Sequence, residues 1–70
     1  MKAVLDASAL LAWLQNKPGA AIVEEVLPES AISSLNWSEV LQKSLAHGVE
    51  ITGLRQDMES LGLVILPLLS

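Results

Sequence analysis

The 70-residue sequence contains no cysteine, so neither disulfide bonds nor thiolate zinc sites can support its fold. Glycine and proline are also scarce, with four and three residues, while 51% of the chain is hydrophobic and 17% is charged. This composition is typical of a globular chain and excludes an intrinsically disordered one. A chain this short forms one domain at most, and about 40% of its unfolded surface stays exposed. Residues 1–70 are therefore expected to form a single small domain, with some of the apolar excess facing a partner.

Positive charge is scarce as well. Four Lys and Arg stand against eight Asp and Glu, which gives a net charge of −4. Such a surface does not attract phosphate backbones by its overall field, and we find no basic patch and no phosphate-cradling glycine loop. An acidic protein can still act on nucleic acid where its carboxylates hold divalent cations that bridge to phosphate. The only histidine, His47, gives little support to a Ser/His/Asp triad and is expected at the surface, at a helix end.

Long hydrophobic runs are absent. The longest, residues 63–69, is interrupted by Pro67 and is far shorter than the ~20 residues that a membrane helix needs. The N-terminus only faintly resembles a signal peptide, because Asp6 interrupts its apolar run and no cleavage site follows. We therefore expect no membrane association and a cytoplasmic location.

Hydrophobic periodicity predicts three strands and four helices. Short apolar runs at 2–5, 31–33 and 63–66 are the expected strands. Ser8 is expected to cap a first helix that continues to Leu14, and Pro18 to lie in the first turn of a second. Ser33 or Ser34 is expected to cap the third helix. The residues expected to be buried in the second, third and fourth helices are Ile22, Val23, Val26 and Leu27; Trp37, Val40, Leu41 and Leu45; and Ile51, Leu54, Met58 and Leu61.

The resulting order, β-α-α-β-α-α-β, predicts an α/β fold. Strands separated by helical crossovers are expected to form a parallel sheet with right-handed connections. The fold class is therefore a small three-stranded parallel sheet in a Rossmann-like arrangement.

Asp6 is the first candidate for chemistry. It follows the first strand, and open α/β sheets place their ligands at the carboxyl ends of strands. A carboxylate there can bind a hard cation, and the Ser8 hydroxyl could bond a water of the metal shell. The alternative is that Asp6 merely caps the following helix.

Glu39 is the second candidate. It shares a polar helix face with Asn36 and Lys43, one turn from the helix start, and so could point back towards Asp6. The alternative is a solvated Glu39–Lys43 pair at i,i+4 spacing. Trp13 and Trp37, the only aromatic residues, lie among apolar positions and are expected in the core or an interface rather than as base-stacking platforms.

The segment AVLDASALLAWLQNKPGA contains a hydrophobic strand, an Asp, a small residue and then Ser-Ala. The segment AISSLNWSEVLQK contains an Asn followed three residues later by a Glu. In this order and at this spacing, the two segments resemble the PIN-domain family, especially VapC-type ribonuclease toxins of toxin–antitoxin systems. The resemblance implies a Mg²⁺- or Mn²⁺-dependent endoribonuclease, with RNA as its substrate. It also implies that Asp6 and Glu39 are catalytic metal ligands, supported by Ser8 and Asn36.

The sequence departs from the family in length. PIN domains are nearly twice as long, and their remaining acidic residues follow the third strand. Glu50, Asp57 and Glu59 come too early and are expected to be solvated. Two carboxylates hold Mg²⁺ only weakly, so a truncated PIN-like chain of this kind should be a poor or inactive nuclease alone.

A truncated PIN-like fold would leave its first strand as an exposed edge. Such an edge invites pairing with a second copy, so we expect a homo-oligomer. The residues expected at its interface lie in or next to the apolar first helix and are Leu5, Leu10, Leu11, Trp13 and Leu14. The alternative function is a non-catalytic module that forms oligomers or binds an antitoxin protein. A further alternative is that the 70 residues are a fragment of a longer product.

Overall fold

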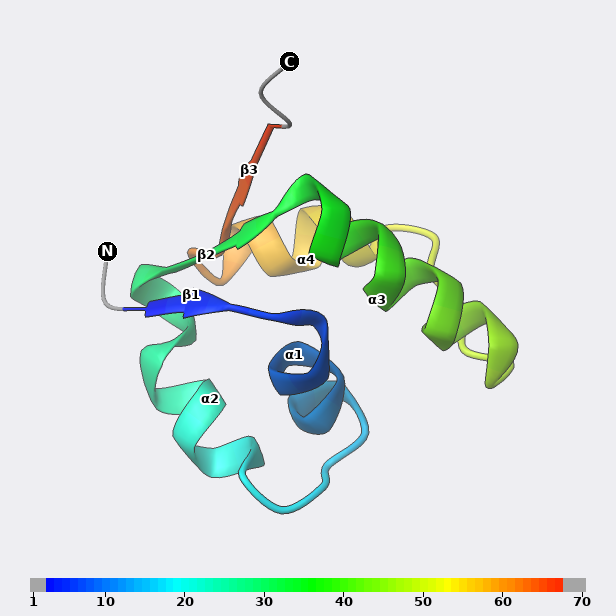
Figure 1. The fold of residues 1–70 in the computed structure, drawn as a ribbon, viewed down its shortest axis with the longest axis horizontal. Helices are drawn as coiled ribbons and strands as arrows, with labels where there is room; N and C mark the ends of the chain where they lie inside the picture. The colour runs from blue at the N-terminus through cyan, green and yellow to red at the C-terminus, as the bar shows by residue number, and fades with distance from the viewer. Residues whose placement is uncertain (1–2, 68–70) are drawn as a thin grey trace.

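The computed structural model describes residues 3–67, which form a three-stranded parallel sheet with helical crossovers (Figure 1). The strands are β1 (Ala3–Leu5), β2 (Ser30–Ser33) and β3 (Val64–Leu66), in the spatial order β1-β2-β3. The register places Leu5 beside Ile32 and Ile32 beside Ile65. β1 therefore lies at an edge of the described sheet.

Two helices fill each crossover. The first crossover holds α1 (Ala7–Leu14) and α2 (Ala20–Val26), followed by the short 3-10 helix η1 (Leu27–Glu29). The second holds α3 (Ser34–Ala46) and α4 (Leu54–Ser60). The predicted α/β class, with a small parallel sheet and four α-helices, is confirmed. None of the helices in residues 3–67 has the length and apolar character required to cross a membrane.

The helix starts follow from local hydrogen bonds, with two differences from the prediction. Asp6, rather than Ser8, caps α1, because its side chain accepts from the backbone N–H of Ala9. The Ser33 side chain caps α3 in the same way. The second helix begins at Ala20 after Gly19 in the left-handed conformation, so Pro18 precedes it instead of lying in its first turn.

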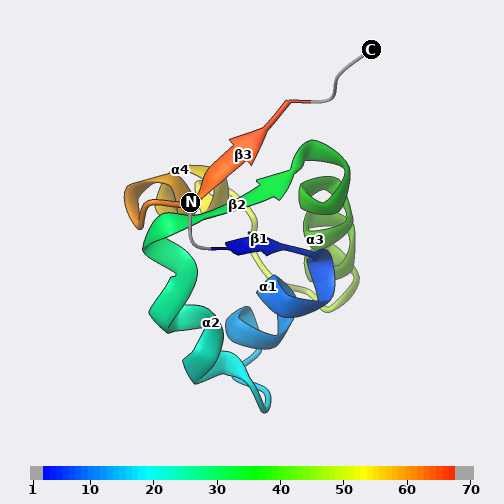
Figure 2. The same ribbon diagram turned by 60° about the vertical axis from the view of Figure 1, so that its left-hand side comes forward.

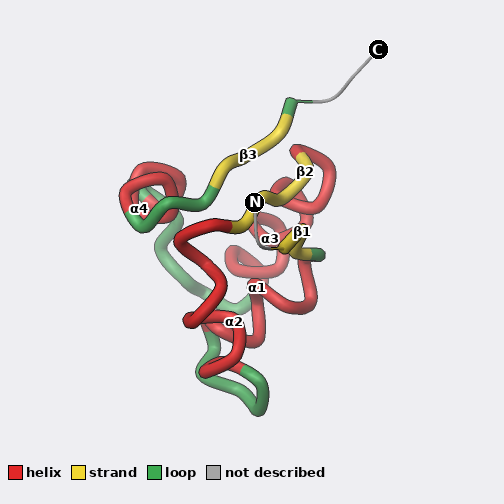
Figure 3. The backbone as a smooth tube through the Cα atoms, turned by 90° about the vertical axis from the view of Figure 1, so that its left-hand side faces the viewer, coloured by secondary structure: helices red, strands yellow, loops and turns green. Residues whose placement is uncertain are grey.

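The helices leave one face of the sheet open. Both crossovers step in the same direction, and right-handed connections then place all the helices on one face. Figure 2 shows the strands in front, with α3 and α4 behind them, and Figure 3 shows α1 and α2 together below the sheet. Accordingly, the row Leu5–Ile32–Ile65 is buried. On the opposite face, Val4 is 68% and Val64 is 53% exposed, whereas Ala31, which lies between them in the register, is 0% exposed, so only the two outer strands present apolar surface there.

The core lies between the sheet and the helices, and it corrects several predictions. Leu10 is 0% and Leu11 8% exposed, because they pack into the chain's own core with Leu5. These three leucines have almost no surface left for a second copy, so their assignment to an oligomer interface is wrong. Trp13 and Leu14 are partly buried against the same core, which leaves each of them some free surface.

Other helix positions also differ from the predicted stripes. Ile22, Leu45 and Leu61, which were expected to be buried, are 70%, 57% and 46% exposed. In α3 the buried positions are Trp37, Val40 and Ser44. Ser44 is buried because it follows Val40 by four residues, on the same face, whereas Leu45 is turned away from the core.

Candidate active site at the carboxyl end of β1

Asp6 lies directly after β1 and begins α1. Its Oδ1 accepts a hydrogen bond from the backbone N–H of Ala9 at 2.8 Å. The capping alternative for Asp6 is therefore confirmed. Capping occupies one oxygen of a group that has two, so it does not prevent the carboxylate from binding a further ligand. The side chain is exposed, which leaves it accessible from solvent.

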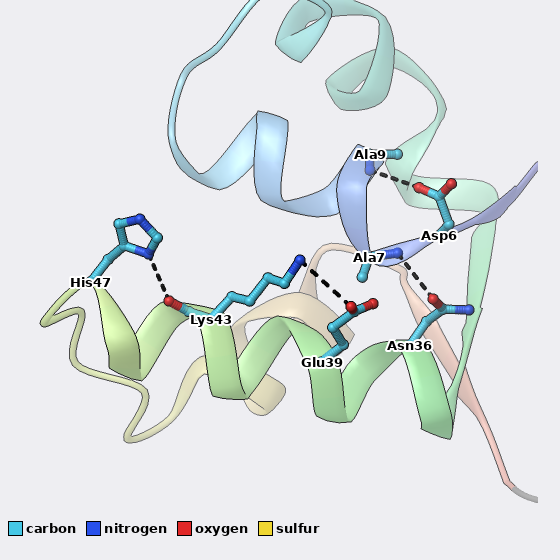
Figure 4. A network of polar contacts seen from close by, with 7 residues as sticks. All are labelled: Asp6, Ala7, Ala9, Asn36, Glu39, Lys43 and His47. Atoms are coloured by element: carbon cyan, nitrogen blue, oxygen red, sulfur yellow. Dashed lines mark hydrogen bonds and ion pairs between the residues drawn. The ribbon is translucent and has the colours of Figure 1, made fainter.

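Asn36 is the residue that joins the two sequence motifs. Its Oδ1 accepts a hydrogen bond from the backbone N–H of Ala7 at 3.3 Å (Figure 4). Its Nδ2 donates to Ser33 Oγ at 3.1 Å, and the same Oγ accepts from the Asn36 backbone N–H. Ser33 thus orients the amide, and the amide holds the start of α3 against the residue that follows Asp6.

Glu39 lies one turn further along α3, on the same face as Asn36. Its Oε1 is 3.5 Å from the Lys43 ammonium, and both side chains are about half exposed, at 48% and 55%. The alternative of a solvated Glu39–Lys43 pair is therefore confirmed. In Figure 4 the Asp6 carboxylate lies towards Ala9 and the Glu39 carboxylate towards Lys43, so each acid has its own local partner.

The described residues do not form a complete metal site. Carboxylate oxygens are the ligands that Mg²⁺ prefers, and Asp6 and Glu39 are of the right kind. Within residues 3–67, however, no three Asp, Glu, His or Cys side chains are grouped so that they could hold an ion. Glu50, Asp57 and Glu59 are exposed, as expected, and add no third ligand. Two carboxylates and several waters are too few for a two-metal cluster.

A pocket of about 300 Å³ lies beside this site, between α1 and the last turns of α3. Its lining residues are Ser8, Leu11, Ala12, Gln15, Lys17, Lys43 and His47. Ser8, predicted to support a metal, thus lies on the side of α1 that borders this pocket. Lys17 and His47 were not predicted as site residues from the sequence. One signal could have found His47, because Asn36, Glu39, Lys43 and His47 follow one another at helical spacing along one face.

Comparisons with known proteins leave the family resemblance without independent support. No protein-family model matches the chain, and neither the search of curated proteins nor that of solved structures found a match.

Proposed function

We propose that the chain carries part of the active site of a PIN-like, metal-dependent ribonuclease. Asp6 and Glu39 are its carboxylates, and Asn36 and Ser8 are its supporting polar residues. The observation that carries this proposal is the hydrogen bond from the Ala7 N–H to Asn36 Oδ1. It fixes the Asn-x-x-Glu segment of α3 against the residue that follows Asp6, at the end of a parallel sheet where α/β folds bind ligands.

Mg²⁺ or Mn²⁺ is the cofactor that this chemistry requires. When bound, it would activate a water and offset the charge that builds up on the phosphate. Asp6 and Glu39 would hold the ion, and the ion would have to displace the Lys43 ammonium from its position 3.5 Å from Glu39. Because two carboxylates bind Mg²⁺ only weakly, we expect little or no RNA hydrolysis by the chain alone. Full activity then requires carboxylates from a second copy or from another polypeptide.

The test measures Mn²⁺ binding and RNA cleavage on the same samples. Mn²⁺ binding is followed by electron paramagnetic resonance, and cleavage of a labelled RNA is followed with Mg²⁺, with Mn²⁺ and with EDTA. The variants are Asp6→Asn and Glu39→Gln, each of which removes one negative charge. Asn caps helices as well as Asp does, so Asp6→Asn should keep the fold. Asp57→Asn is the matched control, because Asp57 is an exposed acid on α4.

We expect Mn²⁺ to bind the wild type weakly and the Asp57→Asn variant equally well. Asp6→Asn and Glu39→Gln should each weaken binding by at least about tenfold, because loss of a residue that only supports a metal ligand already costs about that much. Any cleavage should depend on the metal and disappear in both site variants. Equal Mn²⁺ binding by all four proteins, or cleavage that persists in EDTA, would refute the proposal.

A second candidate is a non-catalytic interaction module, and the open face of the sheet supports it. Val4 and Val64 are more than half exposed on that face, and β1 presents an unpaired edge within the described sheet. Exposed apolar strands at an edge favour pairing with another copy of the chain. The family resemblance implies an antitoxin protein as the other partner, and such a protein would cover the active-site end of the sheet rather than this open face.

Light scattering at micromolar concentration tests the second candidate. A homo-oligomer in the wild type that dissociates in the Val4→Lys variant would support pairing through the open face. Leu35→Lys is the control, because Leu35 is equally exposed, at 69%, but lies on α3. A monomeric wild type would exclude the homo-oligomer.

A further inference from the structure

The pocket between α1 and α3 has a chemical character opposite to that of the whole chain. Lys17 and Lys43, which line it, are two of the four Lys and Arg in the sequence, and His47 is the only histidine. None of the eight Asp and Glu lines it. A protein with a net charge of −4 therefore has a local concentration of cationic side chains at a concave surface. Such a surface attracts an anion.

The pocket contains enough donors to bind an anion with several oxygens. The Lys43 ammonium forms an ion pair with Glu39, but an ion pair between two exposed side chains is weak, so it does not prevent the ammonium from binding a ligand. His47 Nδ1 lies 2.9 Å from the Lys43 carbonyl oxygen. Because a carbonyl only accepts, Nδ1 carries a hydrogen, and the imidazole is fixed beside the pocket.

The remaining lining residues of the pocket add two polar groups and two apolar ones. Ser8 adds a hydroxyl from α1, and Gln15, the residue that follows α1, adds an amide, while Leu11 and Ala12 between them are apolar. These four positions are spaced so that they share one face of the helix. Apolar atoms beside the ammonium groups lower the local dielectric and so strengthen their attraction for an anion. A pocket that has two ammonium groups, a hydroxyl and an amide beside apolar atoms suits a phosphate group better than an apolar ligand.

The pocket also continues the face of α3 that carries the candidate active site. Asn36, Glu39, Lys43 and His47 lie along the side of α3 that faces α1 (Figure 4). Glu39 and Lys43 are one turn apart, a rise of ~6 Å along the helix axis. We propose that this pocket holds a backbone phosphate of a single-stranded RNA while the neighbouring part of the strand passes Asp6 and Glu39. The identity of the ligand as RNA rests on the proposed function, whereas the phosphate chemistry rests on the pocket alone.

The test is a binding titration in EDTA, so that neither metal binding nor cleavage contributes. A short fluorescein-labelled single-stranded RNA of mixed sequence is titrated at low salt and followed by fluorescence anisotropy. The test variants are Lys17→Gln, Lys43→Gln and the double variant. Arg55→Gln is the matched control, because it also removes one positive charge and breaks an exposed i,i+4 pair, here with Glu59. Circular dichroism melts confirm that each variant is folded.

We expect the double variant to bind the RNA at least about tenfold more weakly and to reduce the salt dependence of log K by about 0.7 for each lysine removed. Arg55→Gln should change affinity by less than about twofold. Millimolar inorganic phosphate should compete for the pocket, seen as shifts of the His47 ring signals in NMR spectra.

Two results would overturn the proposal. The first is an absence of RNA binding by the wild type at low salt. The second is an equal loss in Arg55→Gln and the lysine variants, which would reduce the effect to net charge. Phosphate shifts at His47 without RNA binding would instead assign the pocket to a free phosphate and refute the RNA assignment. A failure of metal-dependent cleavage leaves all these readouts intact, so the two proposals fail separately.

Discussion

The backbone of Gly62 packs directly against the backbone of Pro28. A Cβ atom added to Gly62 would clash with the Pro28 carbonyl oxygen and would lie 2.9 Å from the Pro28 Cα. Gly62 lies between α4 and β3, and Pro28 lies in η1, just before β2. The two crossovers thus meet where each one returns to the sheet, and only a residue without a side chain fits between them.

Replacement of Gly62 by Ala should therefore destabilise the protein strongly. The new methyl group would clash with rigid backbone atoms, and Gly62 has φ +100, which other residues rarely adopt. We expect a loss of at least about 2 kcal/mol in the free energy of unfolding, measured by urea denaturation. Gly48→Ala is the control, because Gly48 has φ +74 but no atom within 4 Å of the added Cβ. A loss there of about 1 kcal/mol is expected. Equal effects in the two variants would contradict the close contact.

Two substitutions of Asp6 should separate its role as the cap of α1 from its proposed role as a metal ligand. Its Oδ1 caps α1 through the Ala9 N–H, so Asp6→Ala should cost about 1 kcal/mol in the free energy of unfolding. Asp6→Asn keeps an oxygen acceptor and should change stability by less than about 0.5 kcal/mol. The measurement is thermal denaturation of both variants. A large destabilisation by Asp6→Asn would show that the negative charge itself stabilises the fold.

Asn36 should be required for the junction between α1 and α3. Asn36→Ala removes the acceptor of the Ala7 N–H and the partner of Ser33 Oγ in a partly buried position. We expect a loss of about 1–2 kcal/mol in the free energy of unfolding and faster hydrogen exchange of the Ala7 amide. Gln42→Ala, at an exposed position of the same helix, should leave both quantities unchanged. Unchanged exchange at Ala7 in Asn36→Ala would contradict the hydrogen bond.

The fold could be predicted from the sequence where the chemistry is local. The three strands, the four helices and the capping by Ser33 follow from periodicity and side-chain hydrogen bonding, which act over a few residues. The buried helix positions were predicted less well, because apolar residues at helical spacing do not tell which of two neighbouring positions faces the core. Leu45 therefore looked buried from its type, although the packing of α3 buries Ser44.

The candidate site likewise contains residues that could be predicted from the local sequence and residues that could not. Asp6 and Asn36 could be found from their positions at a strand end and a helix start. The pocket could not, because Lys17 and Lys43 are far apart in the sequence and meet only through the packing of α1 against α3. A search for a local run of basic residues finds no such site.

The Leu10→Ala variant tests whether Leu10 belongs to the core of the single chain or to an oligomer interface. It is 0% exposed in the core of the single chain, so Leu10→Ala should cost about 2–5 kcal/mol and unfold a domain this small. Leu45→Ala, at a position that is 57% exposed, should change stability by less than about 0.5 kcal/mol. Circular dichroism of the two variants measures the difference. A folded Leu10→Ala variant that had lost only its oligomeric state would restore the interface that the sequence predicted.

Glu50 should titrate at a lower pH than an unperturbed glutamate. Hydrogen bonds from the Thr52 side chain and backbone lower the pKa of Glu50 below its ordinary value, and the Thr52 backbone nitrogen lies 2.9 Å from Glu50 Oε1. A pKa that is lower in the folded state stabilises the fold above the unfolded pKa, and this contribution is lost as pH falls through the folded pKa. NMR titration of the Glu50 carboxyl carbon measures the shift. Thr52→Ala should return the pKa part of the way, because it removes the side-chain donor and keeps the backbone one. A wild-type Glu50 pKa at or above that of an unperturbed glutamate would contradict the turn that joins Glu50 to Thr52.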